Sequence, residues 1–457
     1  MNRPGYNQIG RFFLPLAASG LLMTLQQPVV TAGIARMVGA EIALAAYGVA
    51  LNIAVLLESP VQMLLPAANA LTQDRHSYQL LRRFTLFIGL TLSGLLLLVA
   101  SSPLGSLAVS RLINAPPLVA RQVFPALLVM ALWPLVVGWR RFYQGLLIRF
   151  GHTQAVGYAT ACRLLTITLV VILMVNYSHW PGSLVGGLAL MAGAIVEAVI
   201  VTVRVLPLIK AGFLHNESKL KLITKNKDQR SDEKQSPPFD FIALGRFYSP
   251  LAATSILTVV TWPLIAAGIS RAAAPTISLA AWLVALSLLW LWTTPIQMLQ
   301  QVVIALNQGA GSLRAVVRFG LAVGLLGSLL LASFAFTPLI DLFLQYILAA
   351  PDGVTAFTIF AARILVPLPL IVAGQSLLQG LLISRGTTGD VRLAMIVNLV
   401  VLGLLLLGGI VDGRLPGAIL APIAMTGGLV AETAVLWWKL GIRQMDMSLL
   451  HIRSAKQ

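Results

Sequence analysis

The stretch "WRRFYQGLLI", residues 139–148, ends in a pentapeptide that recurs unchanged 235 residues later, at 379–383. Two further pairs superpose at the same shift: "RFFLPLAA" at Arg11 on "RFYSPLAA" at Arg246, and "SPVQML" at Ser59 on "TPIQML" at Thr294. At this single shift, without gaps, the sequence identity of these pairs is far higher than a shared apolar composition would give. The sequence therefore indicates an internal duplication.

The duplicated chain is too apolar for a soluble globular protein. Of its 457 residues 58% are hydrophobic and 10% are charged, whereas soluble domains carry about 25% charged residues, and its mean hydropathy is +0.88. Apolar runs of about 20 residues, each long enough to cross a bilayer as a helix, recur along the chain. The expected spans are 12–35, 42–71, 84–107, 123–148, 155–177, 182–209, 247–270, 277–306, 319–341, 355–383, 393–411 and 415–438. The predicted fold class is an all-α polytopic membrane protein with twelve transmembrane helices.

The two halves contain six predicted spans each, with a long polar segment between them. Because six is an even number, both copies enter the membrane from the same side, so the repeats are parallel and a cleft is expected between two lobes. The polar composition of the central segment is typical of a flexible linker. The predicted divisions are an N-terminal lobe at 1–210, a cytoplasmic basic linker at 211–245, a C-terminal lobe at 246–442 and a cytoplasmic tail at 443–457.

The net charge of +17 follows the membrane topology. Every lysine lies at Lys210 or beyond, in the central segment or the C-terminal region. This pattern predicts that both termini are cytoplasmic, in a bacterial inner membrane, and it requires no nucleic-acid partner. The repeat-matched Arg36 and Arg271, at the outer ends of the first span of each half, are expected to reach the membrane interface.

The chain lacks the residue combinations of an enzyme or a metalloprotein. Cys162 is the single cysteine, and the five histidines fall in or near the predicted loops. We find no nucleophile and base pair, metal-ligand cluster or phosphate loop. We therefore expect no catalysis, no metal and no cofactor, with a proton or sodium gradient as the energy source. The expected partners are a small solute and the bilayer, and we expect a monomer.

Three acidic residues lie well inside predicted spans and are candidates for ion coupling. A charge at the bilayer centre costs about 2.5 to 3.5 kcal/mol on insertion scales, so Glu58, Glu197 and Glu432 each suggest a function. Glu197 and Glu432 are equivalent in the duplication, whereas Glu58 is matched by Thr293. A paired carboxylate that only fixes helix packing is an equally good interpretation of the matched pair.

Polar side chains at corresponding positions of the two halves predict a lined cavity between them. Gln62 lies on the same helical face as Glu58, and Arg140 lies one turn before Gln144. The candidate substrate-binding residues are Arg140, Gln144, Gln62, Gln297, Gln301, Gln375, Gln379 and Arg363. The alternative is that the amides serve only as hydrogen bonds between packed helices.

The adjacent Arg140 and Arg141 cannot share one role. Arg140 lies about nine residues, or roughly 13 Å, from the inner end of its span, too far to reach the headgroups unaided. Neighbouring helical residues point about 100° apart, so we expect Arg140 at the cavity and Arg141 in an ion pair with Glu58. A positive cavity favours carboxylate or phosphate groups, which guanidinium binds in bidentate fashion. If glutamates neutralise each arginine, the cavity is neutral instead.

Two stretches of the second half carry a family resemblance. "RILVPLPLIVAGQSLLQGLLISRGTT", from Arg363, and "LPGAILAPIAMTGGLVAETAVL", from Leu415, resemble the progressive ankylosis family within the superfamily of multidrug and toxic compound extrusion transporters and polysaccharide flippases. The resemblance implies a V-shaped bundle that alternates between inward-open and outward-open states. It also implies anionic cargo such as citrate, nucleotides or pyrophosphate-related species, and it carries over to Arg363 and Glu432. Unlike several drug exporters of the superfamily, the first span has no acid.

These observations predict a secondary-active exporter of a small, anionic organic solute. The alternatives are a flippase for a lipid-linked amphiphile and a drug or cation antiporter of the same superfamily. A membrane-embedded enzyme or scaffold would need a catalytic constellation that the sequence does not offer.

Overall fold

The computed structural model describes residues 6–72, 74–150, 152–224, 241–306, 310–384 and 387–454. The described residues form helices joined by short connections, with one isolated bridge between Ala273 and Pro416. The first half contains α1 (Tyr6–Thr24), α2 (Gln26–Ala35), α3 (Ala40–Glu58), η1 (Ser59–Met63), α4 (Leu64–Leu71), α5 (Arg75–Ser101), α6 (Pro103–Leu107), η2 (Ala108–Leu112), α7 (Pro117–Val129), α8 (Trp133–Arg149), α9 (Thr153–Tyr177) and α10 (Gly182–Thr224). The second half contains α11 (Phe241–Val259), α12 (Thr261–Arg271), α13 (Pro275–Gln297), α14 (Leu299–Leu306), α15 (Ala310–Ala335), α16 (Leu339–Leu342), η3 (Phe343–Ile347), α17 (Asp352–Ile364), α18 (Leu368–Ser384), α19 (Thr388–Asp412) and α20 (Gly417–Ser454).

The predicted membrane-spanning helices are present. Within the described ranges, ten helical segments are long and apolar enough to cross a bilayer, and two bent helix pairs raise the number to twelve. The bent pairs, α7 with α8 and α17 with α18, are equivalent in the duplication and bend by 45° and 48°. Pro134 and Pro369 lie in the first turn of α8 and α18, just after the bends, where a proline is tolerated because the backbone N–H has no intrahelical partner. The sequence predicted the fourth and tenth spans as continuous helices, so the two bends are a correction.

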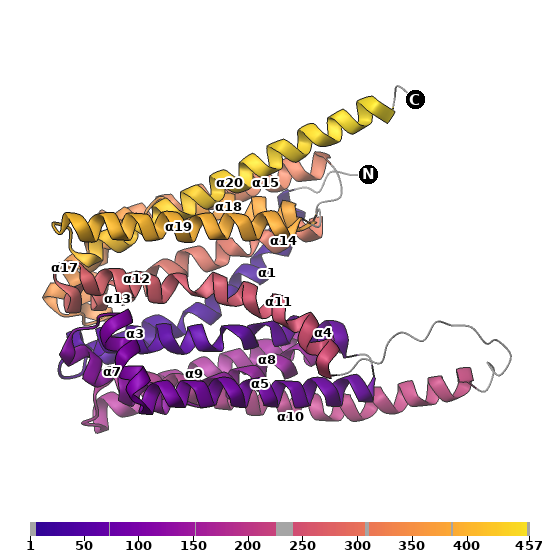
Figure 1. The fold of residues 1–457 in the computed structure, drawn as a ribbon, viewed down its shortest axis with the longest axis horizontal. Coiled ribbons are helices and arrows are strands. Elements are labelled where there is room, and N and C mark those ends of the chain that lie inside the picture. Colours follow the sequence, from indigo (N-terminus) through magenta and orange to yellow (C-terminus); the bar gives the residue numbers. More distant parts are fainter. Residues whose placement is uncertain are drawn as a thin grey trace.

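The two lobes lie close together at one end and diverge toward the end that carries the termini, as Figure 1 shows. The first helix of each half, α1 or α11, crosses to the other lobe. In one crossing the Phe13 ring packs edge-on against Phe319 with centroids 5.6 Å apart. In the repeat-equivalent crossing Tyr248 packs against Phe84 at 5.0 Å. The predicted V-shaped bundle of two parallel repeats is therefore confirmed, and it is tied together by exchanged first helices.

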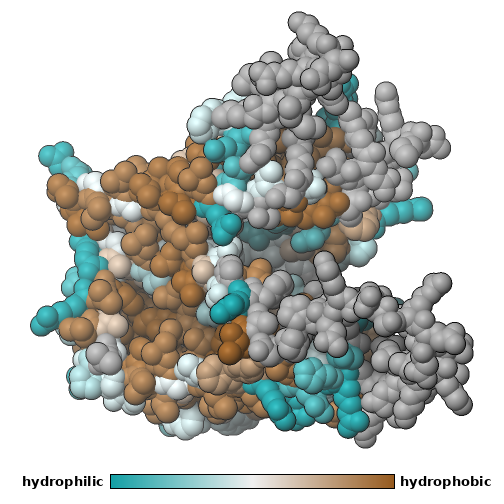
Figure 2. Space-filling view, turned by 45° about the vertical axis from the view of Figure 1, so that its right-hand side comes forward, coloured by the Kyte–Doolittle hydropathy of each residue, from teal (hydrophilic) through white to brown (hydrophobic). Residues whose placement is uncertain are grey.

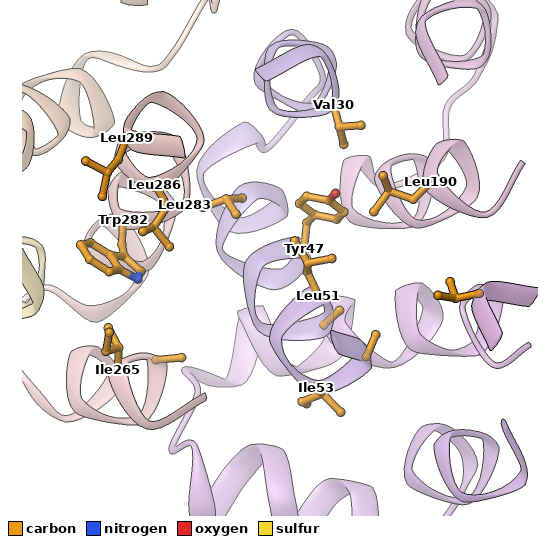
Figure 3. Close-up of a cluster of buried hydrophobic side chains, with 14 of the residues drawn as sticks. Val30, Tyr47, Leu51, Ile53, Leu190, Ile265, Trp282, Leu283, Leu286 and Leu289 are labelled. Atoms are coloured by element: carbon orange, nitrogen blue, oxygen red, sulfur yellow. The ribbon is translucent and has the colours of Figure 1, made fainter. Parts of the chain in front are cut away.

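Helices α3 and α13 pack against each other where the lobes meet. A Cβ atom at Gly48 of α3 would lie 3.5 Å from the Cβ atom of Leu283 on α13, so the two helices approach closely there. Figure 3 shows Leu283 and Leu286 on the α13 side, and Tyr47 and Leu51 on α3. Apolar side chains also cover most of the surface visible in Figure 2, with hydrophilic side chains toward its edges. That surface suits contact with lipid.

The predicted linker and tail begin as helix. Helix α10 continues to Thr224 and α20 continues to Ser454, beyond the predicted ends of the lobes. The extension of α10 contains Lys, Leu and Glu, and that of α20 contains Arg, Gln, Met and Leu, all of which favour helix, so each helix propagates past its apolar segment. Of the rest of the predicted linker, residues 225–240 lie outside the described residues, and residues 241–245 belong to the start of α11.

Two arginines join the lobes at the closed end. Arg36, at the end of α2, donates to carbonyl oxygens of the second lobe over 2.6 to 3.4 Å, and Arg271, at the end of α12, donates to carbonyl oxygens of the first lobe over 2.8 and 3.2 Å. The acceptors are Tyr346, Ile347 and Leu348 for Arg36, and Arg111 and Ile113 for Arg271. Cations are favoured at these carbonyl-rich helix ends. The pair, which we call the arginine latch, crosses between the lobes, and its position at the membrane interface stays a prediction.

Candidate functional site

The repeated motif QGLLI, at residues 144–148 and 379–383, places a carboxylate-binding amide in each lobe. The Gln144 Nε2 atom donates to Glu197 Oε1 over 3.0 Å, and Gln379 Nε2 donates to Glu432 Oε1 over 3.0 Å. A Cβ atom at the following Gly145 would clash with the Leu65 carbonyl oxygen of α4, and one at the equivalent Gly380 would lie 2.9 Å from the Gln300 carbonyl oxygen of α14. Glycine permits this close helix approach. In each lobe the glutamine of the motif therefore donates one hydrogen bond, and the glycine allows two helices to pack closely.

In the N-terminal lobe, Glu197 is fully buried and surrounded by donors. Arg140 forms an ion pair with it, and Arg163 Nη1 donates to its Oε2 atom over 3.2 Å. Gln144 and Thr160 each donate to the Oε1 atom over 3.0 Å. The four donors come from α8 and α9, so this carboxylate on α10 binds three helices together. These contacts fit the interpretation that Glu197 fixes the packing of the helices around it.

A second polar chain joins α3 and η1 to α8. Glu58 accepts a hydrogen bond from Trp133 Nε1 and another, over 2.6 Å, from Gln62 Nε2. The Oε1 atom of Gln62 in turn accepts from Arg141 Nη2 over 2.8 Å. Arg141 therefore reaches Glu58 through an amide and not by the direct ion pair that was expected. Among the described residues, no carboxylate contacts Arg141.

The equivalent carboxylate of the C-terminal lobe has neutral partners. Glu432 is 2% exposed and accepts from Gln379 and, over 2.7 Å, from Asn398 Nδ2. The duplication places Asn398 where the first lobe has Arg163, and Gln375 where it has Arg140. Within the described part of the chain, no lysine or arginine forms an ion pair with Glu432. The two lobes thus hold the equivalent carboxylate in different surroundings: two arginines contact Glu197, whereas neutral amides contact Glu432.

A cavity of about 270 Å³ lies beside Glu432 in the C-terminal lobe. Its polar lining comes from α11, α12, α13, α14, α18, α19 and α20 and includes Thr258, Thr261, Thr293, Gln297, Gln300, Gln375, Gln379, Asn398 and Glu432. Trp262 and Trp290 form another part of the wall, packed edge to face with centroids 5.5 Å apart. The cavity therefore combines one carboxylate, several amides and a pair of indole rings.

The predicted binding residues divide between three places. Gln297, Gln375 and Gln379 line the cavity, whereas Gln62 and Gln144 belong to the hydrogen-bond chains of the first lobe. Gln301 is exposed away from the cavity, and its neighbour Gln300 lines it instead, because a turn at Met298 between α13 and α14 rotates the register.

Neither Arg140, which was predicted at the cavity, nor Arg141 is among the residues that line it. Arg140 is 3% exposed and paired with Glu197, while the partly exposed Arg141 lacks a carboxylate partner among the described residues. Arg363 also lies away from the cavity: its Nε atom donates to the Ala335 carbonyl over 3.1 Å and its guanidinium lies 5.4 Å from the Phe336 ring centroid.

The sequence-based reasoning missed several residues of these networks. Arg163 and Asn398 are equivalent in the duplication, and their exchange is the signal in the sequence for the charge difference between the lobes. Gln26 accepts from Arg163, and nothing in its neighbourhood in the sequence marked it. Over the described residues, no group of three or more His, Cys, Asp or Glu side chains could hold a metal ion.

Comparison with known families supports the predicted resemblance. The family model of the Progressive ankylosis protein (ANKH) matches residues 2–212, which is the first half of the duplication. The stretches that carried the resemblance in the sequence, including Arg363 and Glu432, lie in the other half. No curated protein matches the sequence.

Solved structures match nearly the whole chain at low identity. An inward-facing multidrug resistance MATE family transporter of the MOP superfamily is 13% identical and has a TM-score of 0.62. The match covers 96% of this chain and 95% of the transporter chain. The lipid II flippase MurJ, in an inward closed conformation, is 12% identical, with coverage of 92% and 86% and a TM-score of 0.68. A MOP superfamily transporter from Pyrococcus furiosus, described as having a binding pocket of reverse polarity, is 13% identical, with coverage of 97% and 97% and a TM-score of 0.59. The fold is therefore MATE-like over the full length.

Proposed function

Because the chain has a MATE-like fold and its first half matches the progressive ankylosis family model, we propose that it is a secondary-active exporter of a small organic anion. The two lobes alternate between states open to opposite sides of the membrane, and an ion gradient drives the cycle. The relatives named above are membrane transporters and a flippase, which supports transport and not catalysis.

The charge difference between the lobes carries this proposal. The first lobe holds three arginines near its polar chains and two glutamates: Arg140, Arg141 and Arg163 with Glu58 and Glu197. The second lobe holds Glu432 with amide partners. An uncompensated charge inside a membrane is costly until a ligand or proton neutralises it. Arg141 is thus suited to an anionic group of the solute, and Glu432 to a proton or a sodium ion.

The arginine latch supports alternating access. In this conformation Arg36 and Arg271 hold the closed end together through hydrogen bonds that cross between the lobes. Separating the lobes at that end requires both sets of hydrogen bonds to break. The repeat symmetry of the latch means that one rotation of the lobes releases both sides together.

The first test of the substrate class is ligand-dependent thermal stabilisation across a panel of carboxylates and phosphates. A true ligand raises the melting temperature with its concentration. Arg141→Gln is expected to weaken that ligand roughly 10- to 100-fold, because a hydrogen bond to a charged group is lost. Arg363→Gln is the control, because Arg363 lies away from the cavity, and this variant should bind the ligand as the parent protein does. Loss in Arg363→Gln with retention in Arg141→Gln would contradict the assignment.

The latch gives a conformational prediction. The double substitution Arg36→Gln and Arg271→Gln should shift the lobes toward separation at the closed end, by roughly tenfold or more in the population ratio. Spin labels at the exposed Val38 and Val411, in a Cys162→Ser background, report the distance between the lobes at that end.

The control for the latch is Arg111→Gln. This substitution removes a charge at the same end of the molecule but keeps the backbone carbonyl that Arg271 binds. Its distance distribution should match that of the parent. Equal distributions for the parent and the latch double variant would show that the latch does not hold the lobes together.

A further inference from the structure

An apolar groove runs along the outer surface of the N-terminal lobe. Helix α8 forms its floor and helices α5 and α10 form its sides, and its volume is about 450 Å³. The lining residues are Leu86, Leu135, Val136, Trp139, Ile195, Ala198, Val199, Thr202 and Val203. Ile195, Val199 and Val203 are 44 to 62% exposed, so the groove opens toward lipid and not into the protein.

The single polar pair in the groove is already satisfied. Trp139 Nε1 donates to Thr202 Oγ1 over 3.0 Å, which leaves the indole ring as an apolar wall. The groove therefore offers its occupant an almost wholly apolar surface, such as an acyl chain requires.

A cation lies at the end of the groove that faces the start of α5. The Arg82 guanidinium carbon is 5.7 Å from the centroid of the Trp139 ring, close enough for a cation–π contact that holds the charge beside the groove. Arg82 is exposed, and among the described residues no carboxylate contacts it. Arg204, which follows the lining residue Val203 on α10, is exposed as well. The groove is thus apolar along its length and positive near one end.

This combination belongs to one lobe only. The duplication replaces Trp139 by Gly374 and Arg82 by Val317, whereas the adjacent Arg83 is matched by Arg318. A cation that served only the orientation of the chain would be expected in both copies, as Arg83 is. Arg82 and Trp139 are therefore a specific pair on the first lobe.

We propose that this groove is a binding site for an anionic phospholipid. One acyl chain lies in the groove over α8, and the phosphate group pairs with Arg82. Basic side chains beside grooves between transmembrane helices suit anionic headgroups, since the cation attracts the phosphate while the apolar walls hold the chain. The bilayer supplies this ligand at high local concentration. The proposal concerns the lipid-facing surface and does not depend on the transported solute.

Native mass spectrometry of the full chain in detergent tests the proposal, with dioleoyl phosphatidylglycerol and dioleoyl phosphatidylcholine as probes. The parent protein should retain phosphatidylglycerol in preference to phosphatidylcholine. Arg82→Gln should reduce the affinity for phosphatidylglycerol about fivefold, the effect of one arginine near the membrane surface. Arg83→Gln, on the same exposed stretch of α5, should bind as the parent does. Equal losses in the two variants would overturn the role of Arg82.

Filling the groove tests the acyl-chain position separately. Val199→Trp should reduce retention of phosphatidylglycerol, because the indole occupies the space over α8. Val400→Trp is the matched control, since Val400 is 54% exposed on α19 and Val199 is 55% exposed. Both positions face lipid, so the substitutions leave the packed interior unchanged. Retention of phosphatidylglycerol by Val199→Trp at the level of Val400→Trp, or displacement of the bound lipid by glycerol 3-phosphate alone, would overturn the proposal.

Discussion

Replacing Glu197 by glutamine is expected to lower the free energy of unfolding by about 3 to 5 kcal/mol, because it leaves two buried arginines without a counter-charge. Arg140 and Arg163 both pair with this carboxylate and are 3% and 7% exposed. Glutamine has the same shape but carries no charge, so the loss measures the electrostatic contribution and not a cavity. Denaturant-induced unfolding in detergent micelles is the measurement.

The duplication supplies the control for this prediction. Glu432→Gln changes the equivalent carboxylate, whose described partners are the amides of Gln379 and Asn398. The two donors bind different oxygens of Glu432, so a glutamine keeps one acceptor and presents an NH2 group at the other position. Asn398 can turn its own Oδ1 atom, which has no hydrogen-bond partner in the described part of the chain, toward that group, so the expected loss is below about 1 kcal/mol. Equal losses for Glu197→Gln and Glu432→Gln would mean that the arginines do not depend on Glu197 for their counter-charge.

The same Glu432→Gln variant should abolish transport driven by an ion gradient. If Glu432 takes up the proton or sodium ion, the neutral amide cannot respond to the gradient, and net flux should fall to the level of vesicles without protein. Exchange of solute for solute, which needs no coupling ion, should persist. The measurement is uptake of labelled solute into reconstituted vesicles with and without the gradient.

The control for coupling is Asp412→Asn. Its carboxylate is in the same lobe but is half exposed at the end of α19, away from the cavity. This variant should transport as the parent does. Gradient-driven flux that survives in Glu432→Gln would exclude that residue as the coupling group.

Much of the fold could be predicted because the chain contains its own internal comparison. The shift of 235 residues that superposes "QGLLI" also superposes helix boundaries: Pro117–Val129 on Asp352–Ile364, and η2 on η3. Apolar length predicted the number of spans. The bends after α7 and α17 escaped prediction, since the apolar run continues through them and a proline in a spanning helix is often tolerated.

The site was predicted less well, because helical geometry gives the angle between residues but not the rotation of the helix. The sequence correctly separated Arg140 from Arg141 by about 100°, but the packing of α8 against α10 decides which of them faces Glu197. The exchange of Arg163 for Asn398 was visible in the sequence. The structural consequence could not be read there, because it depends on both positions contacting the equivalent carboxylate of their lobe, Glu197 or Glu432.

The most direct test of the central claim is solute flux in reconstituted vesicles under an imposed proton or sodium gradient, across a panel of carboxylates and phosphates. The account predicts gradient-driven movement of at least one small anionic solute, with loss of that movement in Arg141→Gln. The absence of flux for every anion under either gradient, from protein that is folded by its thermal transition, would contradict it.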